Sequence, residues 1–347
     1  MKHARSKMAA VAAVAVLALS ACSTTPEAGG GAENADEVLP LSISVFPNSV
    51  EVLMVSVAED AGFFEANGLE VEQVPLTGGP ALITSLLSGS VDIATSVVGI
   101  VWPVMKEGQE VTALTGNARG WFNLIGQPEL SLGEQKGKGD LSQLENIEGL
   151  RVGVSALGSA QQIAIQVMLA DAGLPMDWVT WVPVGGVATA VTAFKEKQVD
   201  LLSTIPPELE LIGEGNFQMV VDMAYHGKFN VLLDYYGAKT SWVKENPEKA
   251  ERFCTSIAEA HNFMVDPANE DAMLPILEST LGIDDEATLR NIYNAYVDVT
   301  FSPVITLDEW EQMDIWLENT DNAGFVPDFE SSVSSTCQDI VLSIKGE

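Results

Sequence analysis

The chain has 347 residues, enough for two domains with sizeable hydrophobic cores. Its 49 acidic residues outnumber its 17 basic residues and give a formal net charge of -32, which makes nucleic acid and anionic lipid poor partners. We interpret most of the acidic excess as a solvated coat that favours solubility. A local set of hydrogen-bond donors can still bind an anion, because salt screens distant charges.

The N-terminus has the pattern of an export signal. Lys2, Arg5 and Lys7 precede an apolar run over residues 8–19 that is too short to span a bilayer. The run ends in Leu-Ser-Ala-Cys, which resembles the lipobox of bacterial lipoproteins, whose cysteine is acylated and becomes the first mature residue. We predict a signal peptide over residues 1–21 and a lipid anchor on Cys22. An ordinary signal peptide or a buried apolar helix is the alternative.

Residues 22–38 contain almost no large apolar side chains and are predicted to form a flexible tether. Two acyl chains on Cys22 would hold the protein at the membrane without a transmembrane helix. The folded part is therefore expected outside the cytoplasm, anchored to the cell membrane.

After the tether, strands alternate with helices. A helix over 52–64 follows the first strand, another starts at Pro80, where a missing N–H costs nothing, and a third begins near Ala160. The alternation predicts βαβ units and parallel-rich sheets. Short strands are expected at residues 42–46, 112–115, 122–125 and 151–154.

The two halves of the chain repeat one pattern. A Gly-Leu turn leads into a strand, a glycine pair, a helix and a short strand with Val-Asp. From the first glycine of the pair to the aspartate is 14 residues in one half and 15 in the other. The repeat predicts two α/β lobes, and its landmarks are Gly68, Gly78, Gly79 and Asp92 in the first half and Gly173, Gly185, Gly186 and Asp200 in the second.

Residues 58–71 resemble the A-x-x-x-G-F-F-x-x-x-G-L-x-V stretch of the substrate-binding proteins for sulfonates, taurine, nitrate and thiamine precursors, the NMT1/THI5-like and SsuA-like group. Residues 86–94 match that family's L-x-x-G-x-x-D-x-A, and residues 149–154 loosely resemble its second-lobe opening. The resemblance covers about residues 39–246. It implies an α/β, type II periplasmic-binding-protein fold, with two lobes joined by two crossings around a ligand cleft.

On this basis the first lobe is expected to comprise residues 39–118 and 236–347, including a helical C-terminal tail. The second lobe is expected to comprise residues 119–235. The resemblance also implies that the protein delivers its ligand to the permease and ATPase of an ABC importer. The motifs indicate the fold rather than the ligand, because most of their residues serve packing.

Ligand contacts are expected from loops at the carboxyl ends of the strands, where open parallel sheets place their clefts. Several of these loops lead into helix N-termini, which favour an oxyanion, and Arg119 could clamp a sulfonate or carboxylate. The alternative is that Arg119 pairs with a surface carboxylate. The candidate residues are Phe46, Asn48, Ser49, Gly78, Gly79, Ser96, Val97, Asn117, Arg119 and Trp121, and in the second lobe Leu157, Gly158, Ser159, Gly185, Gly186, Pro206 and Glu208.

The sequence argues against an enzyme, because its three histidines have no metal-binding spacing and no G-x-S-x-G or cysteine–histidine pattern occurs. No cofactor or metal is expected. We predict a monomeric binding protein for a small, anionic organic solute. The alternatives are a neutral heterocycle, such as a thiamine-precursor pyrimidine or a flavin, and a sensing module for a membrane receptor.

Cys254 and Cys337 are the two remaining cysteines once Cys22 is acylated. Each lies on an apolar face of a predicted helix in the C-terminal tail. Since an exported chain meets an oxidising compartment, we predict a Cys254–Cys337 disulfide. Two separately buried thiols are the alternative.

Overall fold

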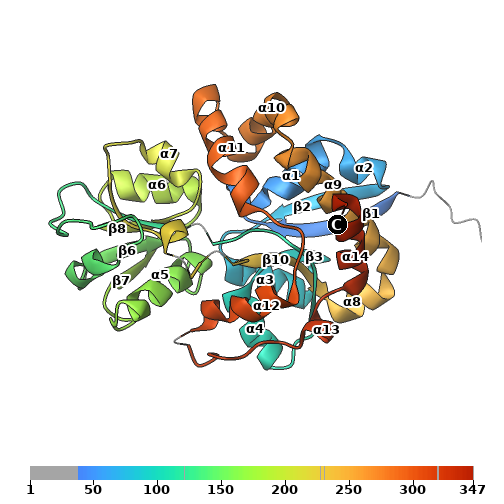
Figure 1. Cartoon of the computed structure of the whole chain (residues 1–347), viewed down its shortest axis with the longest axis horizontal. Coiled ribbons are helices and arrows are strands. Elements are labelled where there is room, and N and C mark those ends of the chain that lie inside the picture. The colour runs from blue at the N-terminus through green and yellow to red at the C-terminus, as the bar shows by residue number, and fades with distance from the viewer. Residues whose placement is uncertain (1–37, 121, 227, 230, 319, 347) are drawn as a thin grey trace, which may run out of the picture. The chain divides into compact units, whose positions relative to one another are not determined.

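The computed structural model describes residues 38–120, 122–226, 228–229, 231–318 and 320–346 (Figure 1). The predicted signal peptide, Cys22 and the tether up to residue 37 lie outside these residues. Over the described ranges, no helix has the length and apolar character needed to cross a membrane.

The first sheet has five strands in the order β2-β1-β3-β10-β4. β1 is parallel to β2 and β3, and β10 runs antiparallel between β3 and β4. We call this sheet and the helices packed on it lobe I. Its strands are β1 (Leu39–Val45), β2 (Leu69–Pro75), β3 (Ile93–Val97), β4 (Val111–Gly116) and β10 (Asp234–Lys239).

The second sheet has the order β7-β6-β8-β5-β9 and repeats this arrangement. β6 is parallel to β7 and β8, and β5 runs antiparallel between β8 and β9. We call this sheet and its helices lobe II. Its strands are β5 (Asn123–Gly126), β6 (Arg151–Val154), β7 (Thr180–Pro183), β8 (Leu201–Thr204) and β9 (Gln218–Asp222).

The antiparallel strand of each sheet connects the lobes. β5 follows the strand β4 of lobe I along the chain, and β10 follows β9 of lobe II. The prediction of two α/β lobes with parallel-rich sheets is confirmed. Each sheet nevertheless contains one antiparallel strand, because the chain enters it from the other lobe.

The helices of lobe I follow the repeat with one interruption. The single helix predicted over 52–64 is broken at Gly62, whose φ of +82° lies in the left-handed region and starts a new helix. α3 begins where Pro80 predicted a helix start. The elements are η1 (Val50–Val52), α1 (Leu53–Asp60), α2 (Phe63–Ala66), α3 (Gly79–Ser88) and α4 (Val98–Lys106).

Lobe II carries α5 (Ala160–Asp171), α6 (Val187–Lys195) and α7 (Glu208–Ile212), with the short elements η2 (Ser142–Asn146) and η3 (Met223–Tyr225). Figure 1 shows α5 and α6 on opposite sides of its sheet. Phe194 of α6 and Met168 of α5 are accordingly buried in different hydrophobic clusters.

After β10, the tail from residue 240 is mostly helical. Its longest helix, α9, packs against α1 and β4, and the final helix α14 packs along α9. The helices are α8 (Thr240–Glu245), α9 (Pro247–Val265), η4 (Pro267–Asn269), α10 (Glu270–Leu281), α11 (Glu286–Thr300), α12 (Leu307–Gln312), η5 (Met313–Leu317), α13 (Phe329–Ser332) and α14 (Ser335–Lys345).

A disulfide joins the tail to itself. The sulfur atoms of Cys254 in α9 and Cys337 in α14 are 2.03 Å apart, and the Cα atoms are 5.5 Å apart. Both side chains are buried. The bridge holds the last helix on lobe I.

The repeated aspartate of each half has a structural role. Asp92 Oδ2 accepts a hydrogen bond from Ser42 N at 3.0 Å, and Asp200 Oδ2 accepts one from Arg151 N at 2.8 Å. In return, the amides of Asp92 and Asp200 donate to the carbonyls of Ser42 and Arg151. Each aspartate thus ties a parallel strand of its sheet, β1 or β6, to the segment that leads into the neighbouring parallel strand, β3 or β8.

Candidate functional site

A small cavity lies between the loops that follow the parallel strands of the two lobes. Its volume of about 20 Å³ holds roughly one water, so a larger solute needs the walls to move apart. It is lined by Phe46, Glu51, Gly78, Gly79, Leu82 and Val97 of lobe I and by Ser155, Ser159, Ala160, Gln161 and Ile205 of lobe II.

The first glycine of each repeated pair has a conformation that favours glycine. The φ angles of Gly78 and Gly185 are +87° and +83°. A Cβ on Gly78 would also lie only 2.9 Å from Cβ of Ala156 in lobe II. Gly78 therefore serves the approach of the two lobes as well as the turn.

Two helices of the repeat begin at the cavity. α3 starts at Gly79, and α5 starts after Ser159, whose hydroxyl accepts from Gln162 N. The first N–H groups of a helix lack acceptors within it and carry the positive end of its dipole. α5 can therefore direct the N–H groups of its first turn towards this space, whereas α3 contributes at most that of Gly79, because Pro80 has no N–H and Ala81 N donates to Gly78 O.

The amide of Gln161 holds the lobe II wall in place. Its Oε1 accepts from Ser155 N at 2.7 Å, and its Nε2 donates to Ser203 O at 2.8 Å. Because both polar ends are engaged with the backbone, Gln161 positions the loop after β6. The hydroxyl of Ser155 has no such protein partner among the residues that the structure describes.

Carboxyl groups dominate the lobe I side and its junction with lobe II. Glu51 is only 7% exposed, and burial raises its pKa to about 7. Glu208 is 2% exposed, and burial raises its pKa to about 8, although Ile205 N donates to its Oε2 at 2.9 Å. Burial and the nearby Glu51 also hold the pKa of Asp234 well above its usual value. Desolvation therefore favours the neutral form of each of these carboxyl groups.

Some of the predicted ligand-binding residues line this cavity, and others bond to residues beside it. Phe46, Gly78, Gly79, Val97 and Ser159 line it. Asn117 Nδ2 donates to Glu51 O at 3.1 Å, and Pro206 O accepts from Val50 N at 3.4 Å. Glu208 bonds the backbone beside the lining residue Ile205, and a Cβ on Gly186 would lie 4.0 Å from Thr77 Oγ1 of lobe I.

Other predicted residues have local partners. The hydroxyls of Ser49 and Ser96 donate to the carbonyls of Phe46 and Ala94. Gly158 N donates to Gln162 Oε1. Leu157 is 58% exposed. These residues shape the loops, and Trp121 lies outside the described residues.

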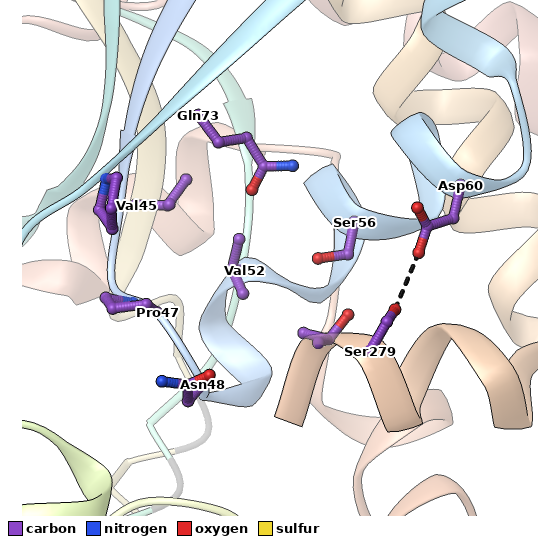
Figure 2. A pocket seen from close by; sticks show the side chains of 10 residues that line it. Val45, Pro47, Asn48, Val52, Ser56, Asp60, Gln73 and Ser279 are labelled. Carbon is purple, nitrogen blue, oxygen red and sulfur yellow. Dashed lines mark hydrogen bonds between the residues drawn. The ribbon is translucent and has the colours of Figure 1, made fainter. Parts of the chain in front are cut away.

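Asn48 belongs to a different hollow. Figure 2 shows this groove of about 330 Å³ on lobe I, where Asn48 lies with Ser56 and Gln73. At its edge the hydroxyl of Ser279 in α10 donates to Asp60 Oδ2 at 3.0 Å. The segment after β1, which includes η1, thus places Phe46 and Glu51 at the cavity and Asn48 in this groove.

Arg119 does not line the cavity. Its Nη2 lies 3.1 Å from Glu309 Oε1 of α12, and its backbone N donates to Thr300 O. The structure therefore shows the alternative pairing, with a carboxylate of the tail.

The sequence analysis missed Glu51, Ser155, Gln161 and Asp234. For Glu51 a signal existed, since it is the one charged residue in the apolar run over 50–58. The role of Asp234 depends on the return of the chain from lobe II and has no local signal.

No group of three or more His, Cys, Asp and Glu side chains that could hold a metal ion occurs within the described part of the chain. The histidines of the folded region, His226 and His261, do not line the cavity.

A family model described as "NMT1/THI5 like" matches residues 49–270, well over half of the chain. The chain belongs to the NMT1/THI5-like family. The match includes both glycine pairs of the repeat and nearly all residues that line the cavity.

Curated relatives of this NMT1/THI5-like protein include a chain from Brucella abortus with the provisional name of binding protein. It is 23% identical over 282 residues, which cover 80% of this chain and 83% of the relative. This identity extends over both lobes.

Solved structures share the fold. A Bordetella bronchiseptica protein superposes with a TM-score of 0.77 at 21% identity, covering 89% of this chain and 98% of its own. The alkanesulfonate-binding protein SsuA from Xanthomonas axonopodis, bound to MOPS, has a TM-score of 0.65 at 15% identity (81% and 91% covered). The predicted periplasmic-binding-protein fold is therefore confirmed.

Two further neighbours differ in their described roles. A ligand-binding component of an ABC-type import system from Staphylococcus aureus, with zinc bound, has a TM-score of 0.66 at 12% identity (87% and 98% covered). The desulfurization enzyme DszB has a TM-score of 0.60 at 14% identity (88% and 99% covered). The fold alone thus accommodates both binding and catalysis.

Proposed function

We propose that this protein is a lipid-anchored, extracytoplasmic solute-binding protein that captures a small organic molecule between its lobes and delivers it to an ABC importer. The observation that carries the proposal is the cavity between two equivalent sets of strand-end loops, with the buried side chain of Glu51 in its wall. The names of the Brucella and Staphylococcus proteins support binding and import.

The N-termini of α3 and α5 at this cavity favour a solute that carries a hydrogen-bond acceptor, such as a carboxylate or a sulfonate. Arg119 gives no such support, because Glu309 occupies its guanidinium. The anionic solute of the sequence analysis thus stays a prediction that depends on backbone donors.

Differential scanning fluorimetry against a metabolite panel tests solute capture. A compound at a hundred times its dissociation constant stabilises the protein by about 2.7 kcal/mol. Gly78→Ala should abolish that shift, because its Cβ would meet Ala156 across the cavity. Gly108→Ala is the matched control, with a similar φ of +96° but open space around its Cβ. Equal shifts in both variants would exclude the cavity as the binding site.

The lipid anchor is tested separately. Cys22→Ala should leave an unprocessed or soluble product, because the tether has no other hydrophobic anchor. Cys22→Ala can be compared with Ser23→Ala, which changes the adjacent residue and should leave membrane retention intact. Normal processing and membrane retention of the cysteine variant would refute the anchor.

A further inference from the structure

We propose that the groove on lobe I in Figure 2 is a second binding site and that it takes a small, uncharged polyhydroxylated compound, such as a monosaccharide or a cyclic polyol. This inference goes beyond the proposed function, because the groove is separate from the cavity between the lobes. It follows from a set of neutral polar side chains that line the groove without partners in the described part of the protein.

The groove is formed by lobe I alone. Its walls come from the end of β1 and the segment after it, from η1 and α1, from the end of β2 and from the last turn of α10. Its described lining residues and those of the cavity between the lobes do not overlap. The groove volume of about 330 Å³ lies within the range of about 300 to 1,000 Å³ that is typical of small-molecule sites.

Thr280 is the clearest of the unpaired side chains. It lines the groove and is 9% exposed, and its Oγ1 is fully buried without a hydrogen-bond partner among the described residues. Its neighbour Ser279 shows a common solution for a hydroxyl in a helix, since its Oγ donates to Ile276 O in the preceding turn. A buried hydroxyl without such a bond costs free energy. Because threonine in a helix occupies two χ1 rotamers, Oγ1 can turn towards a ligand in the groove and gain the missing bond.

Three more neutral polar side chains line the groove without side-chain hydrogen bonds over the described ranges, namely Asn48, Ser56 and Gln73. Ser56 on α1 is 9% exposed, and Figure 2 shows the amide of Gln73 extending from β2 towards it. Hydroxyl and primary amide groups each offer both donors and acceptors. Since a ligand hydroxyl also donates and accepts, it can pair with each of these groups in either direction.

The charge of the groove favours an uncharged ligand. Asp60 at the end of α1 is the one charged residue in the described lining, and its Oδ2 already accepts from Ser279 Oγ at 3.0 Å. An anion would meet this carboxylate with no lysine or arginine in the described lining to offset the repulsion. A cation would gain only an ion pair with an exposed carboxylate, which contributes little. Asp60 therefore serves best as an acceptor for hydroxyl groups.

The groove also has an apolar lining, to which Val45, Val52 and Pro75 contribute. The faces of a sugar or cyclitol ring carry C–H groups, and their contact with apolar side chains removes both surfaces from water. A ring with hydroxyls around its edge thus matches both the polar and the apolar parts of the groove.

Two matched pairs of probes test this chemistry. D-Glucose is compared with D-glucuronate, which carries a carboxylate on the same ring, and myo-inositol with cyclohexanol, which keeps one hydroxyl. Calorimetric and NMR titration of the folded, isotope-labelled chain should show binding by glucose or myo-inositol and weaker binding by its counterpart. The side-chain amide signals of Asn48 and Gln73 should shift on binding.

Thr280→Val removes the unpaired hydroxyl and keeps the shape of the side chain. It should weaken binding of the bound probe roughly threefold to tenfold, the effect of losing one neutral hydrogen bond. Thermal stability should not fall, because the hydroxyl has no partner in the described part of the chain. Thr255→Val makes the same change on α9, away from the groove, and should leave binding unchanged. Gln73→Ala, a second groove variant, should also weaken binding.

Gly78→Ala separates the two sites, since its added Cβ meets Ala156 between the lobes. Loss of probe binding in Gly78→Ala but not in Thr280→Val would place the probe in the cavity and overturn the inference. Equal binding by both members of each pair, unchanged affinity in both groove variants, or no binding by glucose and myo-inositol would also overturn it. Each of these outcomes leaves the proposed function standing, because the metabolite panel tests that function at the cavity.

Discussion

Lobes I and II share a sheet order and a parallel core but differ in what surrounds them. In lobe II the chain adds little beyond α5, α6 and α7, whereas lobe I is covered by the C-terminal tail with α9, α10, α11 and α14. The tail also carries the disulfide. The shared part forms the cavity walls, so the additions to lobe I serve stability rather than the site. We therefore expect the two lobes to differ in stability and not in how they form the cavity.

The sharpest test of this difference is removal of the disulfide. Replacing Cys254 and Cys337 by alanine should cost roughly 4 to 5 kcal/mol in the entropic model, because the bridge closes a loop with a sequence separation of 83. Hydrogen exchange should increase in α9 and α14, while the strands of lobe II keep their protection.

Intact-mass measurement after alkylation of the denatured, unreduced protein gives the control. Two added alkyl groups would show free thiols and contradict the bridge. A uniform loss of protection in both lobes would contradict the expected difference between them.

The junction between the lobes should respond to pH. The folded-state pKa of Glu51, about 7, lies above its ordinary value of 4.5. Its contribution to the free energy of unfolding is therefore fully present below about pH 4.5 and is lost as the pH rises through 7. By pH 8 the loss amounts to about 3 kcal/mol. Glu51→Gln should therefore be more stable than the wild type at pH 8 and similar to it at pH 4.5.

Urea unfolding across this pH range measures the effect. Glu59→Gln changes an exposed carboxylate in the neighbouring helix α1. It should leave most of the change in the free energy of unfolding with pH in place. The same pH dependence of stability in the wild type and in Glu51→Gln would exclude a raised pKa of Glu51 in the folded protein.

The smallest expected effect compares the two repeated aspartates. Asp92→Asn and Asp200→Asn should each cost about 1 to 2 kcal/mol, because each replaces the charged acceptor of a strand amide by a neutral one. Only the Asp200 variant should depend on salt, since Asp200 also forms an ion pair with Arg151 at 2.7 Å, whereas Asp92 bonds the neutral Ser42. Thermal unfolding at two salt concentrations distinguishes them, and equal salt dependence would contradict the assignment.

The repeat was predictable because its signals are local. Gly78 and Gly185 have positive φ angles, which residues other than glycine rarely adopt. Pro80 indicates the start of a helix, and the Val-Asp segments predict short strands. For the same reason the lining residues Phe46, Val97 and Ser159 were predictable, since loops at the carboxyl ends of parallel strands meet at one edge. The inward faces of the C-terminal helices likewise predicted a pair of cysteines that the structure joins.

The partners of polar side chains required the tertiary structure. Arg119 reads equally well as an anion clamp or as a surface ion pair, and only the packing of α12 places Glu309 beside it. Glu51 and Asp234 are far apart along the chain, yet the return of β10 into the first sheet brings them close enough for Glu51 to raise the pKa of Asp234. The sequence by itself determined the repeated α/β framework, because backbone conformation and hydrophobic spacing are local properties. The polarity of the cavity was decided by the tertiary structure, because burial and hydrogen-bond partners depend on which distant segments meet.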